Sequence, residues 1–160
     1  MKKVKFGIVG VGDFGVMHIQ ALKQLPEAEV HAVSCRTESR LKAICEKYKI
    51  PNWYTNVDDL MNDPEMDVII VATGEDTHYS FTEKAIREGK HVLLEKPICL
   101  NVEDGKKLLE LEQNTDLYIL PGHILRYDAS YNNAYRILQN EDMYGKILSI
   151  RVKRNVPIER

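Results

Sequence analysis

A glycine-rich turn near the amino terminus constrains the fold of this chain more than any other feature. The sequence GVGDFG, with Gly10, Gly12 and Gly15, follows a β-branched run at 4–9 and opens a segment, 13–25, whose apolar residues recur at helical spacing. A GxGxxG in this strand–turn–helix context is typical of dinucleotide binding. The first glycine permits the tight turn, the second leaves room for a pyrophosphate, and the third lets helix and strand pack closely. A purely structural glycine turn is the alternative.

Strand and helix patterns alternate as far as residue 121, which predicts an α/β fold of the Rossmann type, a doubly wound parallel sheet with helices on both faces. The apolar run at 67–73 is continuous, as expected for a strand that is covered on both sides. The other expected strands lie at 30–34, around 53–54, at 91–94 and at 117–120. The other expected helices are 37–48, a short one capped by Asn56, 77–88 and 102–114.

The pattern changes after Pro121. A helix is expected over 129–139, and apolar and polar residues then alternate over 146–154, which predicts a strand with one solvated face. We therefore predict two domains, a complete one at 1–121 and, at 122–160, the first helix and strand of an incomplete α+β domain. The second is too short to be stable by itself.

Composition and charge exclude several classes of protein. There are 22 Lys and Arg residues against 24 Asp and Glu, a net charge of −2 that gives no electrostatic case for nucleic acid or an anionic membrane as a partner. No apolar run approaches the ~18 residues of a membrane span. The three cysteines are widely spaced, which indicates reduced thiols, and no motif indicates a metal site. We expect a cytoplasmic protein.

The end of the second expected strand bears on the choice of cofactor. An acidic residue ~20 positions after the glycine turn would hold the ribose 2′-OH of NAD, but Cys35 stands there. Two hydroxyls and two guanidiniums surround it instead, from Ser34, Arg36, Thr37 and Arg40. These groups suit a 2′-phosphate, so the sequence favours NADP over NAD. The alternative is that Arg36 stacks on the adenine and Arg40 is merely a solvated helix residue.

Three further stretches carry a resemblance to a known family. They are IVATGEDTHYSFTEKAIREGKHVLLEKPI, GHILRYDASYNNAYRI and YGKILSIRVKR. Together with the glycine turn they resemble the glucose-fructose oxidoreductase, inositol dehydrogenase and rhizopine catabolism family (Gfo/Idh/MocA), of which the EKP tripeptide is the most specific mark. The resemblance runs from residue 4 to about 154. It implies oxidoreduction of a sugar, cyclitol or related polyol, with residues 122–160 beginning a substrate and oligomerisation domain.

The resemblance also implies roles for individual residues. Lys96 would be catalytic, bonding the substrate hydroxyl or carbonyl beside the nicotinamide, and a solvated strand end is the alternative. Asp13, Phe14, Thr73, His78 and Glu95 would border the cofactor, although Gly74-Glu75 replaces the family's usual Pro-Asn. For His78, a ring satisfied by the local backbone is the favoured alternative. For His18, a buried helix histidine is the better interpretation.

Two residues past the expected domain boundary, His123 and Tyr127, could border the substrate, and structural packing is an equal alternative. The family takes its catalytic base from a point beyond residue 160, so the chain is expected to be truncated. Two functions stay open: the cofactor half of an NAD(P)-dependent oxidoreductase, and a standalone, non-catalytic dinucleotide-binding module such as a redox sensor. The strand at 146–154 cannot stand alone, so we expect this segment to be disordered, to fold back or to pair with a second copy. If it is ordered, it predicts a homo-oligomer.

Overall fold

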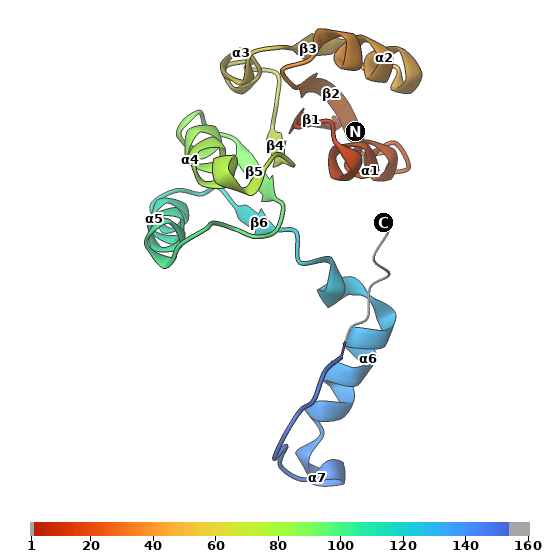
Figure 1. Ribbon diagram of the computed structural model, residues 1–160, viewed down its shortest axis with the longest axis vertical. Helices are drawn as coiled ribbons and strands as arrows, with labels where there is room; N and C mark the ends of the chain where they lie inside the picture. The colour runs from red at the N-terminus through yellow and green to blue at the C-terminus, as the bar shows by residue number, and fades with distance from the viewer. Residues whose placement is uncertain (1, 154–160) are drawn as a thin grey trace. The chain divides into compact units, whose positions relative to one another are not determined.

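The computed structural model describes residues 2–153 and contains one six-stranded sheet in which all strands are parallel. The strand order is β3-β2-β1-β4-β5-β6 (Figure 1). The strands are β1 (Val4–Val9), β2 (Ala28–Ser34), β3 (Asn52–Tyr54), β4 (Val68–Val71), β5 (His91–Leu94) and β6 (Ile119–Pro121). The order reverses between β1 and β4, so the predicted Rossmann-type doubly wound sheet is confirmed.

Helices cover both faces of the sheet because successive strand residues point to opposite sides. On one side, Ile8, Val33 and Ile70 pack with residues of α1 (Asp13–Leu22) and α2 (Glu38–Tyr48). On the other, their neighbours Val9 and Val71 pack with residues of three helices, α3 (Val57–Met61), α4 (His78–Arg87) and α5 (Val102–Gln113). The continuous apolar run of β4 follows from this double coverage.

The ends of several helices are determined by residues that are nearby in the sequence. The side chain of Asn56 caps α3 by accepting a bond from the Asp58 N–H at 3.0 Å, and Asn101 caps α5 in the same way through Asp104. Gly89, just past α4, has φ +75°, a conformation that favours glycine. The helix expected over 77–88 forms as α4, and a 3-10 turn, η1 (Glu75–Thr77), precedes it.

A second compact unit begins at His123, after the first ends at Gly122. It contains η2 (Ile124–Tyr127), α6 (Ala129–Leu138) and α7 (Glu141–Tyr144). Asp128 caps α6 by accepting bonds from the N–H groups of Ser130 and Tyr131. Across residues 2–153, no helix combines the length and the apolar character that a membrane crossing requires.

The strand predicted over 146–154 does not form in its described part, 146–153. A strand needs a neighbour to take up its backbone hydrogen bonds, and no described segment pairs with this one. Alternating hydrophobicity indicates which residues could share a face, but it does not supply that neighbour. Residue 154 lies outside the described residues.

Candidate functional site

The glycine turn between β1 and α1 is shaped by close backbone contacts. Gly10 has φ +93°, and a Cβ there would overlap the carbonyl oxygen of Ala72, the residue that follows β4. A Cβ on Gly15 would overlap the carbonyl of Gly10. At Gly12, in contrast, a Cβ would meet nothing within 4 Å, because this residue faces open space. The first and third glycines therefore serve packing, and the second keeps an approach clear.

The start of α1 is suited to an anion. Gly12 is the N-cap residue, and it has no side chain to accept a hydrogen bond from the first turn of the helix. The N–H groups of that turn and the positive end of the helix dipole therefore remain available to a ligand. A helix start with an uncovered approach is the geometry in which the pyrophosphate of a dinucleotide binds, so these residues fit such a cofactor.

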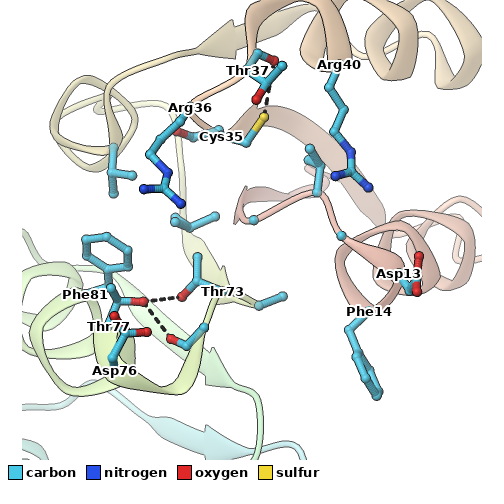
Figure 2. A pocket seen from close by; sticks show the side chains of 18 residues that line it. Asp13, Phe14, Cys35, Arg36, Thr37, Arg40, Thr73, Asp76, Thr77 and Phe81 are labelled. Carbon is cyan, nitrogen blue, oxygen red and sulfur yellow. Dashed lines mark hydrogen bonds between the residues drawn. The ribbon is translucent and has the colours of Figure 1, made fainter.

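A pocket of about 720 Å³ opens at this turn, along the carboxyl ends of β1, β2 and β4 (Figure 2). In an open α/β sheet this edge, at the point where the strand order reverses, is where ligands bind. Nine of the residues predicted from the sequence line the pocket: Gly10, Gly12, Asp13, Phe14, Ser34, Arg36, Thr37, Arg40 and Thr73. Gly15 lies buried in the turn behind them.

The two arginines do not form a phosphate clamp. Arg36 and Arg40 are both exposed, and Figure 2 shows their guanidinium groups pointing to separate parts of the pocket rather than to one point. Within the described residues neither takes part in a hydrogen bond or ion pair. Ser34 also lines the pocket, but it is buried there.

A second pocket, of about 340 Å³, shares Phe14, Thr73 and Gly74 with the first and extends to the end of β5. Glu95 and Lys96, which follow β5, line it. Lys96 is exposed, and its Nζ lies 4.9 Å from the centroid of the Phe14 ring. The structure thus brings the lysine of the EKP tripeptide to the same sheet edge as the glycine turn.

A chain of hydroxyls fixes the end of β4. Thr77 Oγ1 donates to the carbonyl of Gly74 at 2.8 Å, and Thr73 Oγ1 lies 2.7 Å from Thr77 Oγ1 (Figure 2). Because the one proton of Thr77 is directed to Gly74, Thr73 is the donor in the second bond. The lone pairs of Thr73 Oγ1 therefore remain available on the border between the two pockets.

His78 joins the ends of two strands. Its ring is buried, with Nδ1 2.6 Å from the carbonyl oxygen of Pro97 and Nε2 3.3 Å from that of Thr73. The peptide bond between Lys96 and Pro97 is cis. Both ring nitrogens face backbone carbonyls, which agrees with the interpretation of this histidine as one satisfied by the local backbone.

The structure reveals a pair that the sequence did not. His18 Nε2 lies 2.8 Å from Glu95 Oε1, and Glu95 is only 5% exposed. The other carboxylate oxygen of Glu95 accepts a bond from the Lys96 N–H at 3.2 Å. His18 is partly exposed rather than buried as predicted, because its ring reaches from α1 to this carboxylate. The sequence placed His18 four residues after Phe14, at a position common in the family, but gave no sign of its bond to Glu95.

The remaining candidates lie elsewhere. His123 and Tyr127 belong to the second unit, and their role at a substrate stays a prediction. The three cysteines are free thiols, and Cys35 donates weakly to the Thr37 carbonyl at 3.4 Å. Between residues 2 and 153, no three His, Cys, Asp or Glu side chains are grouped so that they could hold a metal ion.

The sheet order, the glycine turn and the two pockets define a dinucleotide-binding Rossmann domain. A family model described as "Oxidoreductase family, NAD-binding Rossmann fold" (GFO_IDH_MocA) matches residues 4–123. This match covers most of the chain, which therefore belongs to the Gfo/Idh/MocA family, as the sequence motifs predicted.

Individual relatives are dehydrogenases of inositols. The chain is 27% identical over 154 residues to myo-inositol 2-dehydrogenase of Thermotoga maritima, covering 96% of this chain and 46% of the relative. It is 30% identical over 143 residues to inositol 2-dehydrogenase of Salmonella typhimurium, and this match covers 88% of this chain and 43% of the relative. The fold is similar to that of scyllo-inositol dehydrogenase from Lactobacillus casei, whose crystal structure contains NAD(H) and scyllo-inositol. The two superpose with a TM-score of 0.83 at 25% identity, and the match covers 88% of this chain and 42% of that chain. The chain spans less than half the length of these relatives.

The comparisons correct the predicted cofactor. The family is described as NAD-binding and the Lactobacillus casei enzyme holds NAD(H), so the preference for NADP over NAD that we drew from Ser34, Arg36, Thr37 and Arg40 is wrong. The physical reason lies in the geometry given above, since two exposed arginines that do not converge make no specific site for a 2′-phosphate. The absence of an acidic residue was not sufficient to predict NADP.

Proposed function

We propose that this chain is the cofactor-binding part of an NAD-dependent oxidoreductase that transfers a hydride between NAD and a cyclitol, sugar or related polyol. The observation that carries the proposal is the continuity of the two pockets. The larger one begins at the start of α1, and the smaller one shares Phe14 and Thr73 with it and ends at Lys96. The relatives named for inositols support the substrate class.

The residues of the first pocket bind and orient the cofactor. NAD, when bound, supplies the nicotinamide ring that accepts or returns the hydride. The free N–H groups at the start of α1 hold the pyrophosphate, and Gly12 keeps the approach to them clear. Thr73, whose hydroxyl is fixed by Thr77, borders the passage toward Lys96 and offers its lone pairs there.

Lys96 acts at the reacting oxygen of the substrate. In the oxidation, the carbon loses a hydride with its electron pair, the hydroxyl loses a proton, and the C–O bond becomes C=O. The ammonium of Lys96 donates a hydrogen bond to this oxygen and stabilises the negative charge that develops on it. The proton passes to a different group, because an ammonium has no free electron pair to accept it.

Cofactor binding is tested by thermal unfolding with NAD. At 100 times its dissociation constant NAD adds ~2.7 kcal/mol of stability, a rise in Tm of roughly 5–11 °C for a chain of this size. Gly12→Val places a side chain in the open approach and should remove this rise. Met17→Val, on the exposed side of the same helix, is the control and should retain it. Absence of a rise in the wild-type chain would overturn the proposal.

Hydride transfer is tested by the formation of NADH, followed by absorbance, with a panel of inositols, sugars and linear polyols. We expect turnover with at least one cyclitol or sugar, and its loss in Lys96→Met, which retains the length of the side chain without its charge. Binding of NAD without any turnover would favour the non-catalytic module instead.

A further inference from the structure

One face of α1 is turned toward the dipeptide that contains Lys96. Phe14 and His18 are four residues apart on this helix and therefore lie on the same side, one turn above the other. Phe14 contacts Lys96, and His18 contacts Glu95. We infer that these four residues form a clasp through which α1 positions Lys96, so that the helix proposed to hold the cofactor pyrophosphate also orients the group proposed to act at the substrate. That this positioning serves catalysis rests on the proposed function.

The first half of the α1 clasp is a cation–π contact. The Nζ of Lys96 lies 4.9 Å from the centroid of the Phe14 ring, within the ~6 Å at which an aromatic face attracts an ammonium. Both side chains line the smaller pocket, and both are exposed. A long lysine side chain in that setting would otherwise sample many rotamers. The ring of Phe14 reduces this freedom and keeps the ammonium at the mouth of the pocket.

The second half is a buried carboxylate. Glu95 is 5% exposed, and a charged group at such a position needs strong partners. One oxygen lies 2.8 Å from His18 Nε2, and the other accepts the Lys96 N–H at 3.2 Å. Gly122 packs against the same side chain, since a Cβ on it would stand 3.4 Å from Glu95 Cδ. The carboxylate is thus held in place, and it fixes the backbone from which Lys96 extends.

The two halves act on different parts of the same residue. His18, through Glu95, sets the backbone of Lys96, while Phe14 sets its ammonium. Neither contact is local in sequence, since His18 and Glu95 are 77 residues apart. A displacement of α1 when the pyrophosphate binds would therefore be felt at Lys96 through both contacts. We regard Phe14, His18 and Glu95 as positioning residues in this sense.

Nuclear magnetic resonance of the full chain with ¹³C-dimethylated lysines tests the clasp. Dimethylation keeps the positive charge of a lysine, and the Lys96 signal is identified by its loss in Lys96→Arg. Methyl groups above an aromatic face are shifted upfield, so the Lys96 signal should lie upfield of the signals of lysines in open solvent. Phe14→Leu should remove this shift, and Phe14→Tyr, which retains the ring, should preserve it.

The chain offers a matched control for the ring effect. Lys107 Nζ lies 5.8 Å from the ring centroid of Tyr79, on the far side of the sheet from α1. Tyr79→Leu should move the Lys107 signal and leave that of Lys96 unchanged. In Phe14→Leu the Lys107 signal should keep its wild-type position, which also shows that the variant is folded.

Variants of His18 test the second half. His18→Leu should reduce the upfield shift of Lys96, because Glu95 then loses its partner and no longer fixes the backbone. His18→Gln retains a side-chain donor and should restore the shift. Equal Lys96 signals in the wild type, Phe14→Leu and His18→Leu would overturn the clasp.

Addition of NAD separates the clasp from the proposed function. Movement of the Lys96 signal in the wild type, reduced in both His18→Leu and Phe14→Leu, supports both. A clasp that responds to the variants, in a chain that gives no response to NAD, would leave the clasp standing and contradict the proposed function. A response to NAD that is identical in all variants would contradict the clasp alone.

Discussion

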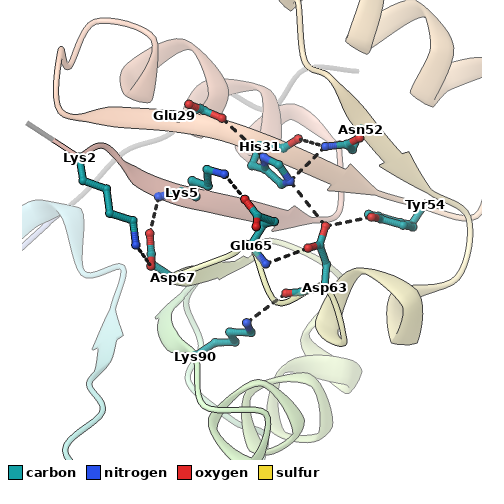
Figure 3. Close-up of polar contacts among 10 residues, drawn as sticks. All are labelled: Lys2, Lys5, Glu29, His31, Asn52, Tyr54, Asp63, Glu65, Asp67 and Lys90. Atoms are coloured by element: carbon teal, nitrogen blue, oxygen red, sulfur yellow. Dashed lines mark hydrogen bonds and ion pairs between the residues drawn. The ribbon is translucent and has the colours of Figure 1, made fainter.

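At the scale of single residues, Asp63 anchors the loop that connects α3 to β4. Figure 3 shows its carboxylate among polar groups from several elements. Its Oδ2 accepts from the Tyr54 hydroxyl at 2.9 Å, and its Oδ1 accepts from the Glu65 N–H at 2.9 Å. His31 Nε2 lies 3.6 Å away, and Lys90 donates to the Asp63 carbonyl. Although burial by itself raises the pKa of Asp63, these bonds and charges outweigh it and hold the pKa below its usual value.

The lowered pKa of Asp63 predicts the direction in which the stability of the fold changes at acid pH. A carboxylate whose folded pKa lies below its unfolded value of about 3.9 stabilises the fold above that value, and the contribution is lost as the pH falls through the folded pKa. Asp63→Asn should therefore reduce the free energy of unfolding by about 1–3 kcal/mol at pH 7 and flatten its decline below about pH 4. Urea titrations at several pH values measure both effects. Asp59→Asn, at an exposed position of α3, should change neither.

The residues of the candidate site differ in how far sequence could predict them. Gly10, Gly12 and Gly15 are recognisable because a local turn imposes their spacing, and Lys96 because it lies in a specific tripeptide. The bond between His18 and Glu95 was not predictable, since it joins two positions that only the fold brings together. The choice of cofactor was predicted wrongly from the residues around Cys35, because residue types do not say where their side chains point.

At the scale of elements, the turn from β1 into α1 separates packing from ligand approach. Gly15 touches the backbone of Gly10, whereas Gly12 faces open space. Gly15→Ala should therefore cost about 3 kcal/mol of folding stability, by forcing the helix away from the turn. Gly12→Ala, at φ −71°, should cost less than about 1 kcal/mol and act mainly on affinity for NAD. Urea unfolding and NAD titration of the two variants measure this contrast, which equal losses of stability would contradict.

Elements were predictable wherever their signal is local. The apolar run of β4, the caps at Asn56 and Asn101 and the glycine after α4 depend on residues near each other in the chain. The helix predicted over 77–88 formed as α4, but the 3-10 turn η1 before it was not predicted, because it depends on the bonds that join Thr77 to Thr73 and Gly74. The strand over 146–154 was mispredicted since strand pairing depends on a distant partner.

At the scale of the whole molecule, the two units differ in how far their apolar side chains are buried. All residues of the two hydrophobic cores lie in the first unit, between β1 and β6. In the second, Leu148 is 97% exposed, and Ile147, Ile150 and Val152 are also exposed. These four apolar side chains lie within six residues that have no strand partner in the described part of the chain, and they form a surface that favours association.

We therefore expect the chain to self-associate through residues 147–152. Sedimentation velocity over a range of concentrations should show a reversible oligomer for the wild type. Leu148→Lys combined with Ile150→Lys should shift the equilibrium toward the monomer, because two charges oppose the pairing of identical segments. Gln113→Lys with Asn114→Lys, at the end of α5, adds the same charge elsewhere and should leave association unchanged. If both double variants behave as the wild type does, residues 147–152 are not the contact; if both become monomeric, net charge rather than this segment controls association.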